Sequence, residues 1–172
     1  DGFFFKDKKV AVVGGGNSAL IEAIYLKQIG CSEVYVIHRR DQFRAEESYV
    51  KEAEEKGVNF VMDSTVEKIN GEERVESLDL KDKDTGEINN LKVDGVFVSI
   101  GEIPQNDLAK KLSVNLDKKG YIKIDKMGRT NIDGVYAAGD ITGGLRQVIT
   151  AAAEGAVAAL TSTEKLGKKY PY

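Results

Sequence analysis

The sequence has a single cysteine, little net charge and no long apolar run, and each of these features excludes or disfavours a class of protein. Cys31 is the only cysteine among the 172 residues, which excludes an intramolecular disulfide framework and fits a reducing compartment. The formal net charge of −3 argues against a nucleic acid or an anionic membrane as the partner. The apolar stretches are too short or too interrupted to span a bilayer. We therefore predict a cytoplasmic protein without membrane contact.

What the sequence does contain is the composition of a globular protein. Hydrophobic residues make up 41% of the chain and charged residues 31%. A length of 172 residues suffices for one domain, or one and a half. The first residue is Asp1, with neither an initiator methionine nor a signal-peptide pattern. We therefore expect the chain to be a fragment of a longer protein.

A glycine triplet separates a short apolar run, residues 10–13, from a helix-like stretch that starts at residue 17. Small residues spaced as glycine, glycine and alanine between a strand and a helix form a dinucleotide-binding fingerprint. They permit a tight turn, close approach to a pyrophosphate and close packing of helix on strand, and free N–H groups at the helix start add an anion site. Because a glycine triplet can also be a plain turn, the following residues decide. The pyrophosphate-binding residues predicted here are Gly14, Gly15, Gly16, Asn17, Ser18 and Ala19.

The residues beyond the next predicted strand, 34–37, indicate which dinucleotide is bound. An NAD site carries an acidic residue there for the ribose 2′-hydroxyl, whereas an NADP site carries arginine for the 2′-phosphate. Here His38, Arg39 and Arg40 follow the strand, and Arg44 comes shortly after. Guanidinium groups match phosphate oxygens with paired donors, so we predict an NADP(H) site in which His38 lines the phosphate pocket. A solvated basic turn or a nucleic-acid patch is the alternative.

The order of the predicted elements indicates an α/β fold with a Rossmann-like parallel sheet. Between residues 64 and 93 the apolar period is two, which predicts an antiparallel meander of three strands inserted beside that sheet. The apolar residues 95–100 are expected to return to the sheet centre, so that Ile100 and Gly101 border the nucleotide; an ordinary buried strand end is the alternative. The βαβαβ unit comprises strands at 8–13, 34–37 and 58–62 and helices at 17–29 and 45–56.

The remaining residues belong to a different unit. We assign residues 1–102 to the dinucleotide-binding domain and residues 103–172 to a second, incomplete α/β domain. The second part has a short predicted helix near 106–112 and a long alanine-rich one at about 146–166. Too few strands are predicted there to bury a core. We therefore expect it to be the tail of a domain whose first part lies elsewhere.

These motifs resemble those of the low-molecular-weight thioredoxin reductases, and the resemblance covers essentially the entire chain. Residues 14–19 (Gly-Gly-Gly-Asn-Ser-Ala) and 38–46 (His-Arg-Arg-Asp-Gln-Phe-Arg-Ala-Glu) are similar to that family's NADPH signature. The closing part of the family's FAD domain resembles residues 129–130 (Arg-Thr), 134–140 (Gly-Val-Tyr-Ala-Ala-Gly-Asp) and 146–148 (Arg-Gln-Val).

The resemblance implies an NADPH-dependent flavoprotein that reduces disulfides. Hydride would pass from NADPH to FAD, and electrons then to a Cys-x-x-Cys disulfide and on to thioredoxin or a thioredoxin-like protein, in a homodimer. By matching position Asp140 would hydrogen-bond the ribityl chain of the flavin, and an N-cap for a following turn is the alternative role. The residues that the resemblance implies for the FAD site are Gly139, Asp140, Arg146, Gln147 and Val148.

The sequence also departs from the family. The Cys-x-x-Cys and the glycine fingerprint of the first FAD segment are absent, and no metal site is predicted. Asp1-Gly2-Phe3 resembles the residues that follow the cysteine pair, so Asp1 matches a proposed proton donor to the dithiol. We therefore expect the parent protein to be a thioredoxin-disulfide reductase and these 172 residues alone to be inactive.

Other functions remain open. The flavoprotein subunit of alkyl hydroperoxide reductase and the thioredoxin-reductase-like ferredoxin–NADP reductases have similar nucleotide motifs, although Asp1-Gly2 fits the cysteine-bearing branch better. A non-catalytic NADP(H)-binding module is the alternative from another class. An NADP-linked dehydrogenase is disfavoured, because no Tyr-x-x-x-Lys or comparable acid–base pair lies near the expected nicotinamide end.

Overall fold

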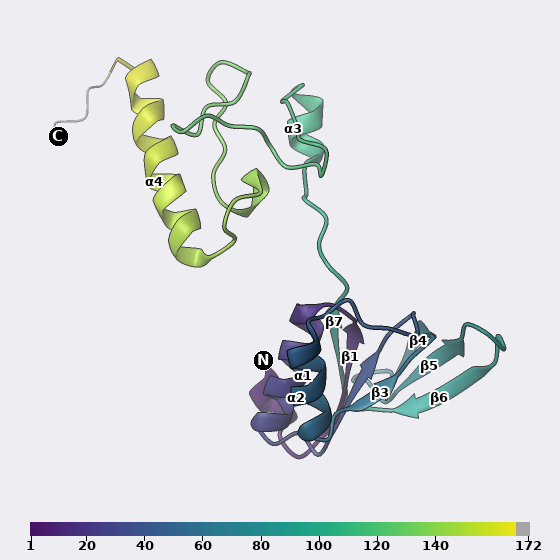
Figure 1. The fold of residues 1–172 in the computed structure, drawn as a ribbon. Coiled ribbons are helices and arrows are strands. Elements are labelled where there is room, and N and C mark those ends of the chain that lie inside the picture. Colours follow the sequence, from purple (N-terminus) through teal and green to yellow (C-terminus); the bar gives the residue numbers. More distant parts are fainter. Residues whose placement is uncertain (168–172) are drawn as a thin grey trace. The chain divides into compact units, whose positions relative to one another are not determined.

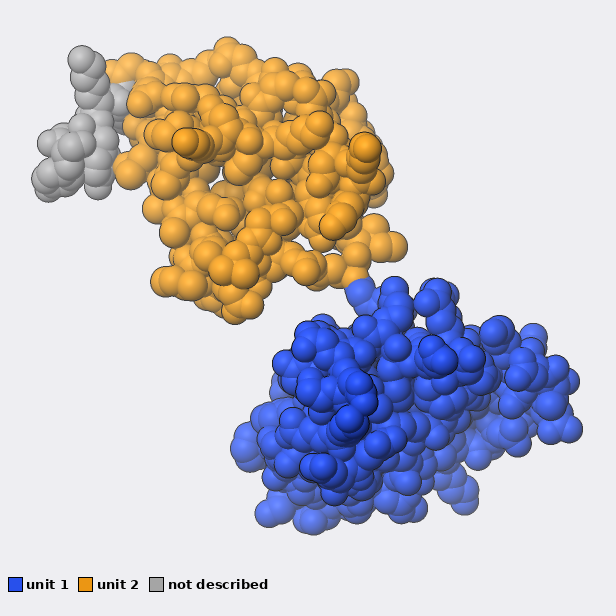
Figure 2. All heavy atoms as spheres, in the orientation of Figure 1, with its two compact units in different colours: residues 1–101 blue, residues 102–172 orange. Residues whose placement is uncertain are grey.

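A computed structural model describes residues 1–167 and divides the chain into two compact units, Asp1–Gly101 and Glu102–Tyr172 (Figure 2). The division falls directly after the apolar strand that closes the first unit. Assigning one unit to NADPH and the other to FAD stays a prediction.

Unit 1 is built on a parallel sheet of four strands in the order β3-β2-β1-β7, with a second, antiparallel sheet of three strands in the order β4-β5-β6 (Figure 1). The predicted α/β class, with a Rossmann-like sheet and an antiparallel meander, is confirmed. In chain order its elements are the 3-10 helix η1 (Gly2–Phe5), β1 (Lys9–Gly14), α1 (Asn17–Gln28), β2 (Glu33–Ile37), α2 (Glu47–Glu55), β3 (Asn59–Val61), β4 (Ser64–Asn70), β5 (Ser77–Asp82), β6 (Ile88–Lys92) and β7 (Gly95–Ser99).

Strand β1 is covered on both faces. Successive side chains of a strand point to opposite faces, and accordingly Val10 and Val12 pack with buried residues of α1 and α2, whereas Ala11 packs with Leu78 and Leu80 of the meander. A strand buried on both sides reads as a continuous apolar run, which is the pattern seen before the glycine triplet. The sheet thus lies between the two helices and the antiparallel meander.

Helix α1 begins at the predicted residue and packs as predicted. Its apolar stripe, spaced for one helical face, is buried. The helix ends at Gln28, and Gly30 follows with a φ of 96°, a left-handed conformation that favours glycine. The buried side chains are those of Ala19, Leu20, Ala23, Ile24 and Leu26.

The position of β7 corrects the prediction that residues 95–100 return to the sheet centre. Within residues 1–167, β7 pairs only with β1, so it is an edge strand, and its Val98 is 63% exposed. Its apolar character has another cause: Val96 packs on the meander cluster, and the Phe97 ring meets the Phe5 ring edge-on at 5.3 Å. An apolar composition indicates that the faces of a strand are covered. It does not indicate how many strands pair with it, so it cannot distinguish a central strand from an edge strand.

Unit 2 contains little regular structure besides one long helix. Within the described part of the unit, strand pairing is limited to the isolated bridges Leu116↔Ile122 and Arg129↔Tyr136. Few of its described side chains are buried, which agrees with the expectation that this segment does not bury a core alone. Its elements are α3 (Asp107–Lys111), the 3-10 helix η2 (Asp140–Thr142) and α4 (Val148–Lys165).

Membrane insertion through a helix has no support in residues 1–167, where none of the helices combines the length and the apolar character needed to cross a bilayer.

Candidate functional site

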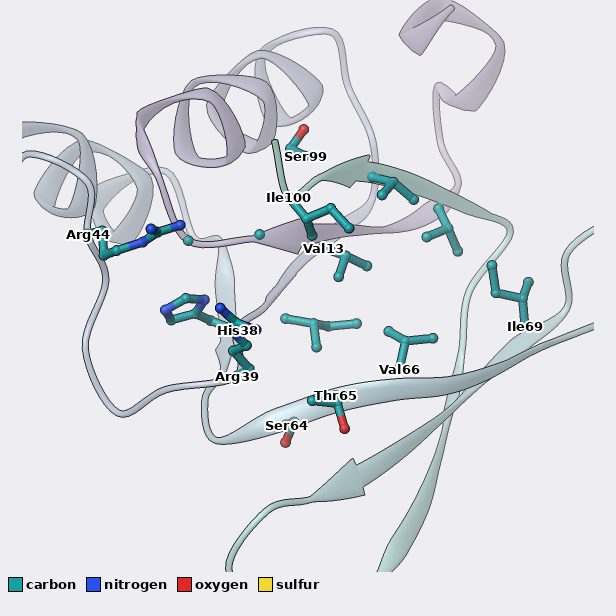
Figure 3. A pocket seen from close by; sticks show the side chains of 15 residues that line it. Val13, His38, Arg39, Arg44, Ser64, Thr65, Val66, Ile69, Ser99 and Ile100 are labelled. Atoms are coloured by element: carbon teal, nitrogen blue, oxygen red, sulfur yellow. The ribbon is translucent and has the colours of Figure 1, made fainter. Parts of the chain in front are cut away.

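A pocket of about 480 Å³ opens at the carboxyl ends of β1, β2 and β7 in unit 1. In open α/β sheets ligands bind in this location. Figure 3 shows His38, Arg39 and Arg44 around one end and Val66 and Ile69 at the other. One end of the pocket is therefore cationic and the other apolar. The residues that line it are Val13, Gly14, Gly15, Ile37, His38, Arg39, Arg44, Ser64, Thr65, Val66, Ile69, Val96, Val98, Ser99 and Ile100.

The glycine turn is held so tightly that its first residue has no room for a side chain. A Cβ at Gly14 would lie 2.4 Å from the carbonyl oxygen of Ser99 and 2.8 Å from the Cβ of Ala19. Ala19 thus lets α1 approach β1 closely, as the fingerprint predicts. At Gly16 the situation is the reverse, because nothing lies within 4 Å of a Cβ placed there. The backbone of Gly16 is therefore open to a ligand.

The start of α1 presents free N–H groups next to this opening. Gly16 is the N-cap, and its carbonyl accepts the first helical hydrogen bond from the Ala19 N–H at 3.0 Å. The N–H groups of Asn17 and Ser18 precede that bond, so they have no partner within the helix. They provide the geometry of an anion site, although Asn17 and Ser18 do not line the pocket itself.

His38 fills the space beside the glycine turn. It is 5% exposed, and a Cβ at Gly15 would lie 2.2 Å from its ring. Its Nε2 donates a hydrogen bond to the Gln42 carbonyl at 3.1 Å, and its ring stacks on Phe43 with a centroid distance of 5.4 Å. Burial lowers the pKa of His38, the Gln42 carbonyl partly offsets this, and the nearby guanidinium groups lower it further. His38 is therefore a neutral, packed wall of the pocket near pH 7.

The arginines separate into two groups. Arg39 and Arg44 line the pocket, whereas Arg40 does not. All three are exposed, and none of them belongs to a salt bridge found within residues 1–167. Two guanidinium groups are therefore available to an anion in the pocket, and the third lies outside it.

Hydrogen bonds connect the arginine-bearing loop to the glycine turn. The Arg44 N–H donates to the Gly15 carbonyl at 2.8 Å. The Asn17 side chain donates to the Glu46 carboxylate at 2.9 Å and accepts from the Glu46 N–H at 2.8 Å. These contacts set the spacing between the anion site at the start of α1 and the guanidinium groups.

Several lining residues were missed by the sequence reasoning. Ser64, Thr65, Val66 and Ile69 come from β4 of the meander. Alternation gives the two faces of β4, but it does not tell which face meets the parallel sheet. Of the strand end predicted at the nucleotide, Ile100 lines the pocket and Gly101 does not.

The residues implied for FAD lie together in unit 2, in the segment that leads into α4. The Gly139 N–H donates to the Glu154 carboxylate at 2.8 Å. Asp140 is exposed and is the first residue of η2, whose N-cap is Gly139. Arg146 forms an ion pair with Glu102. Gln147 is the N-cap of α4, and Val148, its first residue, is 88% exposed.

Glu154 was also missed by the sequence reasoning, because it lies in the helix interior, 14 residues after Asp140. Asp1 is exposed and is not among the residues that line the pocket, and its role as a proton donor to a dithiol stays a prediction.

Comparison with known proteins places these features in a family. The profile of the pyridine nucleotide-disulphide oxidoreductases matches residues 3–155. The chain is similar to the thioredoxin reductase of Streptomyces coelicolor, with 42% identity over 93% of the chain and 50% of the relative. The thioredoxin reductase of Mycolicibacterium smegmatis is 40% identical over 98% of the chain and 55% of the relative.

Solved structures give the same result. The T. acidophilum thioredoxin reductase superposes with a TM-score of 0.72 and 37% identity, covering 98% of this chain and 56% of that one. The enzyme from Streptococcus pyogenes gives a TM-score of 0.75 with 38% identity over 97% and 55% of the two chains. The chain thus spans about half the length of the proteins it matches. Because the family profile covers most of its length, including the glycine turn and the adjoining arginine loop, this chain belongs to the pyridine nucleotide-disulphide oxidoreductases.

Proposed function

We propose that unit 1 binds NADPH, with the 2′-phosphate between Arg39 and Arg44 and the diphosphate on the turn at Gly15 and Gly16. The observation that carries this proposal is that one pocket is lined both by Gly14 and Gly15 of the glycine turn and by two guanidinium groups for which residues 1–167 offer no salt-bridge partner. The open space at Gly16 fits a ligand that approaches the backbone closely. Arginine on the 2′-phosphate distinguishes NADPH from NADH.

The residues of unit 2 fit one part of a flavin site. Because residue 139 is a glycine, no side chain keeps a ligand away from the backbone there, and both Asp140 and the start of α4 are exposed. A carboxylate offers acceptors to the hydroxyls of a ribityl chain, and the positive end of the α4 dipole would favour a reduced, anionic flavin. In a flavoprotein of this kind NADPH supplies a hydride and FAD accepts it. Glu154 would hold the Gly139 loop in place for that contact.

For the longer protein we propose thioredoxin reductase activity. Support comes from its relatives in Streptomyces coelicolor, Mycolicibacterium smegmatis and T. acidophilum, which are thioredoxin reductases. The 172 residues contain one cysteine, and it is buried, so we assign the disulfide step to the longer protein and not to these residues alone. Thioredoxin or a thioredoxin-like protein as the partner, a homodimer and a cytoplasmic location belong to the same proposal.

The test compares binding of NADPH and NADH to arginine variants. Arg39→Ala combined with Arg44→Ala should weaken NADPH about 10- to 100-fold and leave NADH nearly unchanged, because only NADPH carries the 2′-phosphate. Arg40→Ala is the matched control, since Arg40 is outside the pocket, and should change neither affinity by much. Isothermal titration at fixed salt measures both constants. Equal weakening of NADPH and NADH would overturn the assignment of the phosphate.

A further inference from the structure

A half-buried carboxylate on α1 contacts the end of β7. Glu22 lies in the second turn of α1, between the buried residues Leu20 and Ala23. The hydroxyl of Ser99 donates a hydrogen bond to the Glu22 carboxylate, joining residues 77 positions apart in the sequence. Ser99 is the last residue of β7. The contact therefore fastens the end of this edge strand to the helix that starts at the glycine turn.

The end of β7 is in turn part of the pocket. Ser99 pairs with Gly14 in the parallel ladder, and its carbonyl oxygen would lie 2.4 Å from a Cβ at Gly14. Ser99 and Ile100 both line the pocket. A shift of Ser99 would therefore move one wall of the pocket and disturb the strand pairing at Gly14, where the glycine turn begins.

Among the residues that the structure describes, the Ser99 hydroxyl is the one polar partner found for the Glu22 carboxylate. No salt bridge found within residues 1–167 includes it. A partly buried carboxylate loses hydration, and a hydrogen bond is needed to offset this loss. An edge strand with one free side also depends more on side-chain contacts for its position than a strand paired on both sides does.

We infer that Glu22 is a positioning residue: through Ser99 it holds the end of β7 against the glycine turn and thereby sets the site for the diphosphate. The inference rests on the proposed function. It gives Glu22 a role in binding any dinucleotide, which is distinct from the choice between NADPH and NADH made by the arginines. Ligands that lack the diphosphate are bound without help from this contact.

The test measures the affinities of NADPH, NADH and adenosine 2′-phosphate, which has no diphosphate. Glu22→Ala should weaken NADPH and NADH by the same factor, about tenfold, and leave adenosine 2′-phosphate unchanged. Glu22→Gln keeps a hydrogen-bond acceptor and should stay close to the wild type. Ser99→Ala should match Glu22→Ala, and the double variant should be no weaker than either, since both remove the same contact.

Two results would overturn the inference. One is wild-type affinity of Glu22→Ala for both dinucleotides. The other is an equal loss for all three ligands together with a lower melting temperature, which would mean that the contact only stabilises the fold. The proposed function fails separately: in that case the wild type does not prefer NADPH to NADH, whatever the behaviour of the Glu22 variants. Should the wild type bind neither dinucleotide, both proposals fall.

Discussion

Two adjacent glycines of the turn have different reasons to be glycine. Gly15 is pressed against the His38 ring, which would lie 2.2 Å from a Cβ, and its carbonyl accepts the Arg44 N–H. Gly16 faces open space and has a φ of −103°, which any residue adopts. Gly15 thus has no room for a side chain because of the packing of the turn, whereas Gly16 has room for one and its backbone is open to a ligand.

The pair yields a prediction at the residue scale. Gly15→Ala should destabilise unit 1 by about 1–3 kcal/mol, because the methyl group overpacks the buried His38. Gly16→Ala should leave the free energy of unfolding nearly unchanged and weaken NADPH and NADH alike, because the methyl group occupies the space where the diphosphate approaches. Chemical denaturation and titration of both variants measure these effects. A destabilised Gly16→Ala variant with normal dinucleotide binding would contradict this division of roles.

At the scale of elements, the pocket depends on contacts between the start of α1 and the loop that leads into α2. The loop carries the guanidinium groups, and α1 carries the anion site, so their separation decides whether one ligand can reach both. The Asn17 side chain makes two hydrogen bonds to Glu46, the N-cap of α2. These bonds join the two helix starts directly, beside the hydrogen bond from the Arg44 N–H to the Gly15 carbonyl.

Removal of this connection should affect stability and binding together. Asn17→Ala should lower the free energy of unfolding by about 1–2 kcal/mol, since two hydrogen bonds are lost, and weaken NADPH more than NADH as the arginine loop loosens. Asn90→Ala is the matched control: Asn90 donates to Ser77 and Asp79 within the meander, away from the pocket. Denaturation curves and titrations of the two variants test this. Unchanged NADPH preference in Asn17→Ala would show that the loop keeps its place without α1.

At the scale of the whole molecule, the chain consists of two units with unequal cores. Both clusters of buried apolar residues lie in unit 1, and so does every residue that lines the candidate pocket. In the described part of unit 2 large apolar side chains remain exposed, including Leu145, Val148 and Ile149. Unit 1 therefore contains both buried clusters and the whole candidate pocket, whereas the described part of unit 2 leaves much of its apolar surface exposed.

A truncated chain tests this difference. Residues 1–101 alone should fold cooperatively and bind NADPH within about threefold of the affinity of residues 1–172, because the pocket uses no residue beyond Ile100. The complementary piece, residues 102–172, should show weak cooperativity in thermal unfolding. Circular dichroism and titration supply both measurements. Loss of NADPH binding in the shorter chain would show that unit 2 contributes to the site.

The sequence by itself determined the periodic elements. An apolar run, a glycine turn and a buried helical stripe are local patterns, so β1, α1 and the meander could be predicted, and the turn and the arginine loop could be named as parts of one site. The place of β7 at the sheet edge could not be predicted. Its apolar residues show that its faces are covered, but they do not show whether one or two strands pair with it.

Tertiary structure alone decided which residues of that site come together. It selected Arg39 and Arg44 and left out Arg40, added β4 to the pocket wall, and joined Glu22 to Ser99. Such choices depend on the direction of side chains and on contacts between elements distant in sequence. Periodicity gives the face on which a residue lies, and only packing determines what that face meets.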